Sequence, residues 1–344
     1  MQITTVGLDL AKNVFHLIGL NQAQKEVIRK RLRRAHVKRY FANLPPCRVA
    51  MKACGSAHYW GRELRQLGHE VKLIPAQAVK AYVQGNKNDY NDALAIAEAA
   101  NRPKMRFVRI KTTEQQDTQA LHRLRDGAVS HRNKVCNRIR GLLAEYGIVM
   151  ARGVVTLRKA IPELLGDGDH GLSDNFRRLL QQAYRQLQEL DAHIHTYDHA
   201  VKQQARENEA AKRLMSIPGY RLVVSSVYLS AAGDGSAFRR GREVSAYIGL
   251  VPRQHSTGDK SVLLGIRKRG HRQLRTLLIH GARAVVRYAP EKDDALSRWV
   301  TTLVVRRGKH KATVALANKL ARIGWAVLTR GEVYQPTRGS ASSA

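Results

Sequence analysis

Short apolar runs separated by polar turns occupy the first hundred positions, a pattern typical of strands alternating with helices. The spacing predicts strands at residues 3–8, 14–20, 26–32, 48–51 and 71–74. It predicts helices at residues 34–44, 58–67 and 89–100. The first of these helices ends before Pro45-Pro46, because proline lacks the amide proton that would continue it.

Helical spacing dominates the middle of the chain, where apolar residues recur on one face of residues 112–146. A more regular pattern follows, in which steps of four and three alternate for more than three heptads: Phe176, Leu180, Ala183, Leu187, Leu190, Ile194, Tyr197 and Val201. Such a seam predicts a coiled coil. Its partner is either the 112–146 helix or another protomer.

The last third of the chain combines helices with one loop. Two apolar helical segments flank Pro218-Gly219, as in a helix-hairpin-helix, and residues 311–328 predict a final helix. A loop rich in Ser, Thr and Gly at residues 251–260 lies between them. The predicted fold class is α/β plus α. It comprises an RNase H-like (RuvC-like) domain at 1–108, a helical coiled-coil region at 109–208, a mostly α-helical domain at 209–332 and a disordered tail at 333–344.

The charge of the chain restricts its partners. Among 344 residues, 60 are Lys or Arg and 27 are Asp or Glu, which gives a formal net charge of +33. This excess predicts a polyanionic partner, either nucleic acid or an anionic membrane. No segment approaches the about 18 continuous apolar residues that span a membrane, and the amino terminus has no signal-peptide pattern. Three cysteines without metal-ligand spacing favour a reducing cytoplasm.

Three carboxylates stand where they can converge. Asp9 ends the first strand, and Asp89 and Asp92 share one face of a predicted helix. Mg²⁺ prefers such oxygen ligands, and two ions about 4 Å apart can activate a nucleophile and stabilise a leaving oxygen. In so basic a chain, the expected substrate is a phosphodiester. The alternative is that Asp89 caps its helix and Asp92 is a solvated acid in the first turn.

A second set of candidates surrounds the Ser-Thr-Gly loop. Ser256, beside Thr257, is a reasonable nucleophile toward phosphorus, because a phosphoserine link preserves the bond energy needed for rejoining. The alternative is that this segment is an ordinary turn. Backbone-phosphate contacts are predicted for the basic residues nearby: Arg253, Lys260, Arg267, Lys268, Arg269, Arg272 and Arg275.

Six segments in combination resemble a known family: GLDLAKNVFHL, VAMKACGSAHYW, KNDYNDALAIAEA, SIPGY, FRRGREVSAYIGLVPRQHSTG and VALANKLARIGWAVL. Over about residues 3–330, they are similar to the DEDD transposases of the insertion-sequence one-ten family. The resemblance implies a RuvC-like catalytic domain, a coiled-coil insertion and a carboxy-terminal transposase domain with a catalytic serine. It also implies a bacterial, nucleoid-associated DNA recombinase that joins donor and target DNA, is guided by a structured bridge RNA, uses Mg²⁺ and acts as a dimer or tetramer.

Carried over by residue, Asp9, Asp89 and Asp92 match three of the four acids of that family, and Ser256 matches the nucleophile, with Thr257 as the alternative. Lys52 stands where the family has Glu. Its positive charge should repel a metal ion, so this copy cuts poorly, uses one metal or is an altered variant. Two rival functions follow: a metal-dependent, structure-selective nuclease with water as nucleophile, and an impaired nucleic-acid-binding protein.

Overall fold

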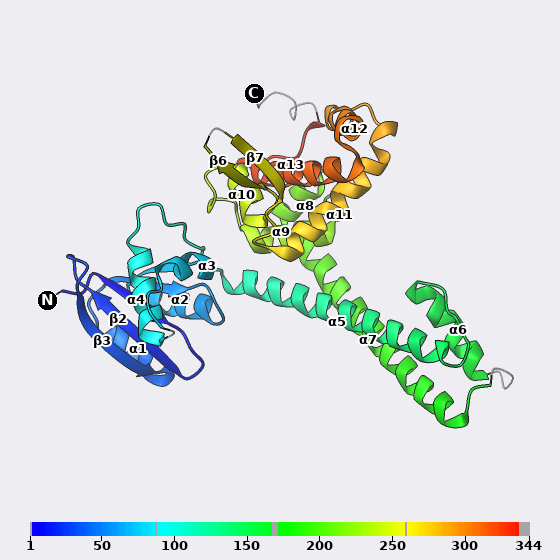
Figure 1. Ribbon diagram of the computed structural model, residues 1–344, viewed down its shortest axis with the longest axis horizontal. Helices are drawn as coiled ribbons and strands as arrows, with labels where there is room; N and C mark the ends of the chain where they lie inside the picture. The colour runs from blue at the N-terminus through cyan, green and yellow to red at the C-terminus, as the bar shows by residue number, and fades with distance from the viewer. Residues whose placement is uncertain (1, 87, 167–170, 259, 337–344) are drawn as a thin grey trace. The chain divides into compact units, whose positions relative to one another are not determined.

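The computed structural model describes residues 2–86, 88–166, 171–258 and 260–336, and the chain forms two compact units, Met1–Thr112 and Thr113–Ala344 (Figure 1). Residues 337–344 of the predicted tail lie outside the described residues. Within the described ranges, no helix is both long and apolar enough to cross a membrane. The predicted boundaries at 108 and 208 stay predictions, and each unit is described by itself below.

A five-stranded sheet forms the centre of the first unit. Its strands are β1 (Thr5–Asp9), β2 (Val14–Leu20), β3 (Glu26–Arg33), β4 (Arg48–Lys52) and β5 (Glu70–Ile74). Their order is β3-β2-β1-β4-β5. The first three strands form an antiparallel meander, and β4 and β5 run parallel to β1. This mixed sheet agrees with the predicted α/β class of the first domain.

Helices cover both faces of this sheet. They are α1 (Arg34–Ala42), α2 (Ala57–Gln66), α3 (Ala76–Val79), the short 3-10 helix η1 (Lys80–Tyr82) and α4 (Asp89–Ala100). Val6 and Leu8 of β1 share one buried cluster with residues of α1 and α2. Side chains alternate along a strand, so Gly7 and Asp9 face the opposite side, which α4 covers.

The second unit begins with a long pair of helices, α5 (Thr113–Ala144) and α7 (Asp174–Glu207), with α6 (Val154–Gly166) between them in the chain. Arg125 donates to Asp198 and Arg132 donates to Asp191, so the two helices run antiparallel. Of the heptad residues from Phe176 to Leu190, Ala183 is partly buried and the others are buried against α5 and α6. The partner of the seam is therefore the helix of the same chain. The coiled-coil geometry itself stays a prediction.

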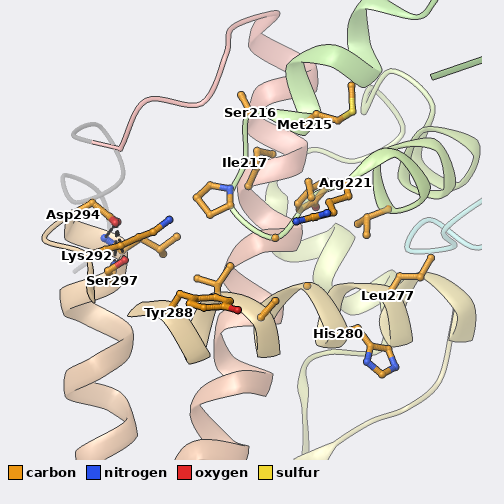
Figure 2. Close-up of a pocket in the computed structure, with 18 residues that line it drawn as sticks. Met215, Ser216, Ile217, Arg221, Leu277, His280, Tyr288, Lys292, Asp294 and Ser297 are labelled. Atoms are coloured by element: carbon orange, nitrogen blue, oxygen red, sulfur yellow. Dashed lines mark hydrogen bonds between the residues drawn. The ribbon is translucent and has the colours of Figure 1, made fainter. Parts of the chain in front are cut away.

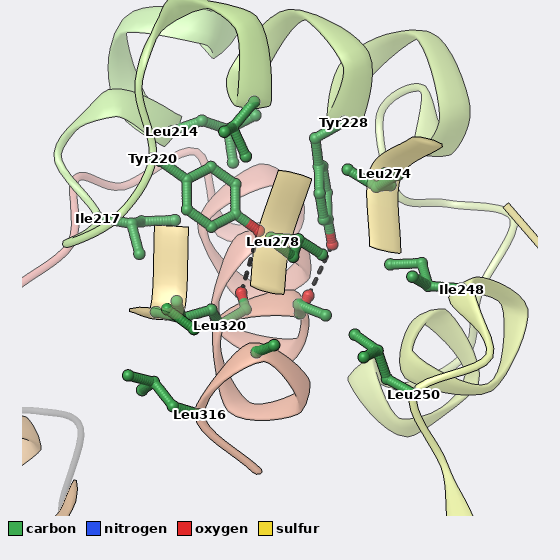
Figure 3. Close-up of a cluster of buried hydrophobic side chains, with 14 of the residues drawn as sticks. Leu214, Ile217, Tyr220, Tyr228, Ile248, Leu250, Leu274, Leu278, Leu316 and Leu320 are labelled. Atoms are coloured by element: carbon green, nitrogen blue, oxygen red, sulfur yellow. Dashed lines mark hydrogen bonds between the residues drawn. The ribbon is translucent and has the colours of Figure 1, made fainter. Parts of the chain in front are cut away.

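The rest of the second unit packs around its last helix. The elements are α8 (Glu209–Met215), α9 (Leu222–Ala232), α10 (Gly241–Ile248), α11 (Arg272–Tyr288), η2 (Ala289–Glu291), α12 (Ala295–Arg307) and α13 (Lys309–Arg330). Figure 3 shows Tyr220 and Tyr228 reaching α13, where their hydroxyls donate to the Leu320 and Ala321 carbonyls at 3.1 and 2.7 Å. These bonds satisfy two buried phenols in an otherwise apolar core.

The predicted Ser-Thr-Gly loop is wrong as a loop. Residues on either side of Gly258 form an antiparallel hairpin of β6 (Pro252–Thr257) and β7 (Lys260–Ile266). The polar sequence of β6 lacks the alternation of apolar and polar residues that marks a half-buried strand. That absence has a physical reason, because every described residue of β6 is exposed.

Candidate functional site

Asp9 lies at the carboxyl end of the central strand of the first unit, and the residue is 9% exposed. The antiparallel register places it opposite His16 of β2. On the other side, Leu8 pairs with Met51 of the parallel strand β4, so the next residue of β4, Lys52, lies beside Asp9. The strand register alone therefore brings Lys52 to this carboxylate.

Gly7 lets helix α4 approach the sheet closely enough to complete the cluster. A Cβ atom at Gly7 would collide with the Ala93 carbonyl oxygen and lie 2.7 Å from the Ala97 amide nitrogen. Any side chain at this position would therefore push α4 away. Because Gly7 and Asp9 share a face of β1, the same contact seats the start of α4 over Asp9.

The start of α4 presents two of the predicted acids. Asn88 is the N-cap, and its side chain accepts a hydrogen bond from the Tyr90 amide at 2.9 Å. The alternative in which Asp89 caps this helix is therefore wrong. Ligand oxygens of Asp9, Asp89 and Asp92 all lie within 4.8 Å of one another. The three predicted carboxylates thus converge, two from the helix and one from the strand.

Lys52 occupies the same place as a counter-ion. Its Nζ lies 3.2 Å from Asp9 Oδ1 and 3.6 Å from Asp92 Oδ1. Burial lowers the pKa of Lys52, but the Asp9 and Asp92 carboxylates outweigh it, so its net pKa is raised and the ammonium stays charged. Burial raises the pKa of Asp9, although Lys52 opposes this shift. The Lys52 ammonium therefore neutralises part of the negative charge of the carboxylate cluster.

His16 is a neighbour of the cluster that the sequence reasoning missed. Its Nδ1 lies 3.4 Å from Asp89 Oδ2, without hydrogen-bond geometry, and its ring packs edge-on against Tyr90 at 4.7 Å between centroids. The signal was present in the tight turn at residues 11–13, since a hairpin turning there places residue 16 opposite residue 9. His16 thereby lies opposite Asp9 in the sheet and against Asp89 of the helix.

The three carboxylates have the ligand chemistry that suits a divalent cation, but the positive charge of Lys52 opposes cation binding. Three carboxylates supply the hard oxygen ligands that such ions prefer. The Lys52 ammonium is bonded to two of these three side chains, so it competes for the same oxygens. A cation would be held by Asp9, Asp89 and Asp92, and Lys52 would have to move away or tolerate its charge.

The two candidate nucleophiles of the hairpin face opposite sides. Ser256 pairs with Ser261 across the ladder and Thr257 pairs with Lys260, so adjacent residues alternate in direction. The Gln254 amide donates to Ser256 Oγ at 3.0 Å, and Ser256 Oγ donates to Ser261 Oγ at 3.4 Å. The Ser256 hydroxyl is thus held in a short polar row, and Thr257 points away from it.

Most of the predicted basic contacts lie at the surface of the second unit. The exposed residues are Arg253, Lys260, Arg267, Lys268, Arg269 and Arg272. Arg275 is different, because the residue is 9% exposed and its guanidinium donates to the Ile248 carbonyl at 2.8 Å. We correct its predicted place: Arg275 is buried, fastens α11 to the end of α10 and is not part of the exposed basic surface.

Two family models match the chain. A model described as "Transposase IS116/IS110/IS902 family" matches residues 211–297, and a DEDD model described as "Transposase" matches residues 6–148. The second match spans the strand and the helix that carry the three carboxylates. The first begins in α8 and contains the β6–β7 hairpin.

Relatives extend over nearly the whole chain. A "Probable family 20 transposase" of Pseudomonas aeruginosa is 46% identical over 98% of this chain and 100% of its own length. The "Transposase for insertion sequence element IS1111A" of Coxiella burnetii is 47% identical over 97% of this chain and 92% of its own. The "Transposase for insertion sequence element IS1328" of Yersinia enterocolitica is 40% identical, with shares of 96% and 98%.

Proposed function

The chain belongs to the IS116/IS110/IS902 family of insertion-sequence transposases, and from that premise we propose that it is a site-specific DNA recombinase guided by a bridge RNA. Membership implies a DNA substrate, a RuvC-like (RNase H-like) first domain and the use of divalent metal. The observation that carries the proposal is the convergence of three carboxylates within 4.8 Å in that domain. The specific metal, nucleophile and guide are the proposed parts.

We assign Mg²⁺ to Asp9, Asp89 and Asp92. When bound, the ion would neutralise charge on the scissile phosphate and its leaving oxygen. The carboxylates hold the ion, and His16 lies against Asp89 Oδ2 at 3.4 Å. Lys52 at 3.2 Å from Asp9 lowers the affinity of the site for any cation, because like charges at such a distance repel.

We assign the nucleophile to Ser256. Its Oγ would form a bond to phosphorus while the bond from phosphorus to a deoxyribose oxygen breaks, and that oxygen leaves as a hydroxyl carrying the serine proton. The phosphoserine keeps one ester bond for each one broken, so a hydroxyl of another strand can reverse the step and rejoin DNA. The amide of Gln254 and the hydroxyl of Ser261 orient Ser256 through their hydrogen bonds.

The nucleic-acid partners of the proposal are donor DNA, target DNA and a structured guide RNA. A net charge of +33 suits several polyanions at once. Arg253, Lys260 and the exposed run Arg267–Arg269, with Arg272, would contact phosphates. We further propose a dimer or tetramer that acts at the bacterial nucleoid in the cytoplasm.

A second candidate is favoured by the surroundings of Ser256 and Lys52. In the described part of the chain, the Ser256 hydroxyl bonds only to Gln254 and Ser261, and neither is a general base. A structure-selective nuclease with water as nucleophile would need the carboxylates alone. The contacts of Lys52 with Asp9 and Asp92 also favour a copy that binds nucleic acid and cuts it poorly.

One experiment separates these functions. The protein is purified from cells carrying its element, the bound RNA is sequenced, and the complex is given labelled duplexes that match loops of that RNA, with Lys52→Glu in parallel. The recombinase predicts one discrete RNA and a protein–DNA adduct that survives denaturation and is stronger in Lys52→Glu. Cleavage without an adduct would support the nuclease, and heterogeneous RNA with no cleavage in either protein would support the binding protein.

A further inference from the structure

The second unit contains a cavity that the chemistry proposed above does not use. It lies between the turn that joins α8 to α9 and one face of α11, and it is closed at one end by residues 292–297. Figure 2 shows Ser216 to Arg221 on one side of this space, and Tyr288 and His280 on the other. Its volume of about 580 Å³ falls within the range of about 300–1,000 Å³ that small-ligand sites occupy.

Two glycines fix the walls of this cavity by direct backbone contact. Gly219 has a φ of +84°, and a Cβ atom there would lie 2.9 Å from the Gly281 carbonyl oxygen. A Cβ atom at Gly281 would collide with the Gly219 carbonyl oxygen. The turn therefore rests on the backbone of α11, and the cavity beside this contact cannot be filled by side chains at either position.

Two permanently charged basic side chains and one histidine line the cavity. Arg221, His280 and Lys292 line it, and all three are exposed. Within the described ranges, none of the three forms an ion pair. Asp294 is the one carboxylate among the lining residues, and it caps α12 by accepting from the Leu296 and Ser297 amides at 3.0 Å and from the Ser297 hydroxyl at 2.6 Å. The cavity therefore favours an anion.

The beginning of α9 adds positive potential at the same wall. Arg221 is its N-cap and provides no side-chain hydrogen bond to the helix. The first intrahelical bond is made by Ser225, whose amide donates to the Arg221 carbonyl at 2.9 Å. The backbone amides of residues 222–224 come before this first bond, so they have no partner within the helix. Such amides attract phosphate.

An aromatic ring and an apolar floor complete the cavity. Tyr288 is 48% exposed at the end of α11, and the Arg287 guanidinium carbon lies 5.5 Å from its ring centroid. Ile217, Leu277 and Val285 line the same space. A base can stack on an exposed aromatic ring for about 1–3 kcal/mol while its phosphate contacts cations nearby.

A second cavity of similar size shows that this character is local. It has a volume of about 630 Å³, lies between α5, α7 and α9, and includes no Lys or Arg among its lining residues. Its charged lining residues are all acidic: Glu114, Asp117, Glu207 and Asp234. In a chain with a net charge of +33, the basic lining of the first cavity is therefore not shared by every cavity of the unit.

We propose that the cavity at the α8–α9 turn binds one nucleotide of a single nucleic-acid strand. The phosphate lies at Arg221 and the start of α9, the base lies against Tyr288, and Lys292 lines the other end of the cavity. DNA and RNA share this chemistry, and the test distinguishes them. The proposal needs only a nucleic-acid partner, so it is independent of the roles given to the carboxylates and to Ser256.

Photocrosslinking of the full chain tests this site directly. Short single strands that carry one 5-iodouracil, in a DNA series and an RNA series, are irradiated with the protein at about 0.3 M salt to suppress non-specific binding. Mass spectrometry then identifies the attached residue. Attachment at Tyr288 in either series supports the proposal and names the nucleic acid, whereas attachment only at residues outside the cavity lining overturns it.

Matched variants separate the ring from the charge. Tyr288→Leu should reduce the crosslink by about tenfold, while Tyr288→Phe, which keeps the ring, retains it. Arg221→Gln should weaken binding of the same strands and lower the slope of log affinity against log salt by about 1. Asp117→Asn in the acidic cavity is the control and should change neither.

Equal crosslinking by Tyr288→Leu and the unaltered chain would contradict the proposed site. A Ser256→Ala background should give the same pattern if the cavity acts independently of the nucleophile.

Discussion

The carboxylate cluster and the serine hairpin carry the two halves of the proposed chemistry, and they are built in opposite ways. Asp9, 9% exposed, is fixed by the register of a central strand, and α4 is held against that strand by the contact at Gly7. Ser256 lies on a two-stranded ribbon in which all six residues of β6 are exposed. Its described side-chain partners belong to the same ribbon.

This difference indicates which part of the proposed chemistry is preformed in the isolated chain. The strand register and the packing of α4 against the sheet fix the positions of the three carboxylates before any ligand binds. A two-stranded hairpin is only marginally stable by itself in water, and Leu263 on β7 is 67% exposed. We infer that the acidic half is preformed, and that the serine half is fixed in place when nucleic acid or another protomer covers the hairpin.

The largest expected effect distinguishes the two hydroxyls of the hairpin. Ser256→Ala should abolish the covalent protein–DNA adduct and lower strand joining by about 10³-fold or more, because no other group takes the place of the nucleophile. Thr257→Ala should stay within about threefold, since Thr257 faces the other side of the ladder. Adduct formation on labelled DNA is the measurement. An adduct that persists in Ser256→Ala and disappears in Thr257→Ala would reverse the assignment.

The next effect tests whether close packing makes the acidic half. Gly7→Ala should destabilise the first unit by about 1–3 kcal/mol, because its methyl group meets the backbone of α4. It should also weaken divalent-ion binding, since α4 carries Asp89 and Asp92. Urea unfolding and Mn²⁺ titration measure the two effects. Gly55→Ala is the control, since a Cβ atom there meets nothing within 4 Å; equal behaviour of the two variants would contradict the packing argument.

The smallest effect concerns a buried polar contact in the second unit, which contrasts with the exposed contacts of the hairpin. His122 is 1% exposed, and its Nε2 lies 2.8 Å from Ser226 Oγ. Burial, with help from Arg125 and His271, lowers the pKa of His122 to about 4. The unfolded chain, with an ordinary pKa of about 6.5, therefore binds this proton first as the pH falls.

The sign of the pH dependence follows from that order. The contribution of His122 to stability is complete above pH about 6.5 and is lost as the pH falls toward 4, with a loss of about 1–2 kcal/mol between pH 7 and 5. Urea unfolding at these two pH values measures it. The control is His122→Gln, whose free energy of unfolding should fall by about 1–2 kcal/mol less than that of the unaltered chain between pH 7 and 5. Parallel curves for the two proteins would show that His122 does not titrate in this way.

Periodicity predicted the parts of the first unit whose positions are set by local patterns. The strand at residues 14–20 and the helix at 89–100 were predicted with the bounds observed. The convergence of Asp9 with Asp89 and Asp92 was also predictable, because a strand end and one helix face are both readable in sequence. His16 was missed because its position depends on pairing across a turn, which involves register as well as pattern.

Exposed and exceptional residues were harder to predict. The hairpin at residues 252–266 has no buried face, so it leaves no alternation of apolar and polar residues to read. Arg275 was grouped with a basic run, although its spacing to the buried residues Leu278, Ala282 and Val286 follows the inward face of α11. The prediction for Arg275 followed the basic charge of the segment rather than the helical periodicity. For a single Arg on a helix, the periodicity was the better guide.

The central claim is that Asp9, Asp89 and Asp92 form a divalent-cation site that Lys52 opposes. Mn²⁺ titration of the full chain, followed by electron paramagnetic resonance, tests it in the unaltered protein, in Lys52→Glu and in Lys52→Glu with Asp9→Asn. The account predicts that Lys52→Glu binds Mn²⁺ at least about tenfold more tightly, because a repelling charge becomes a ligand, and that Asp9→Asn removes the gain. Equal affinities in all three proteins would contradict it.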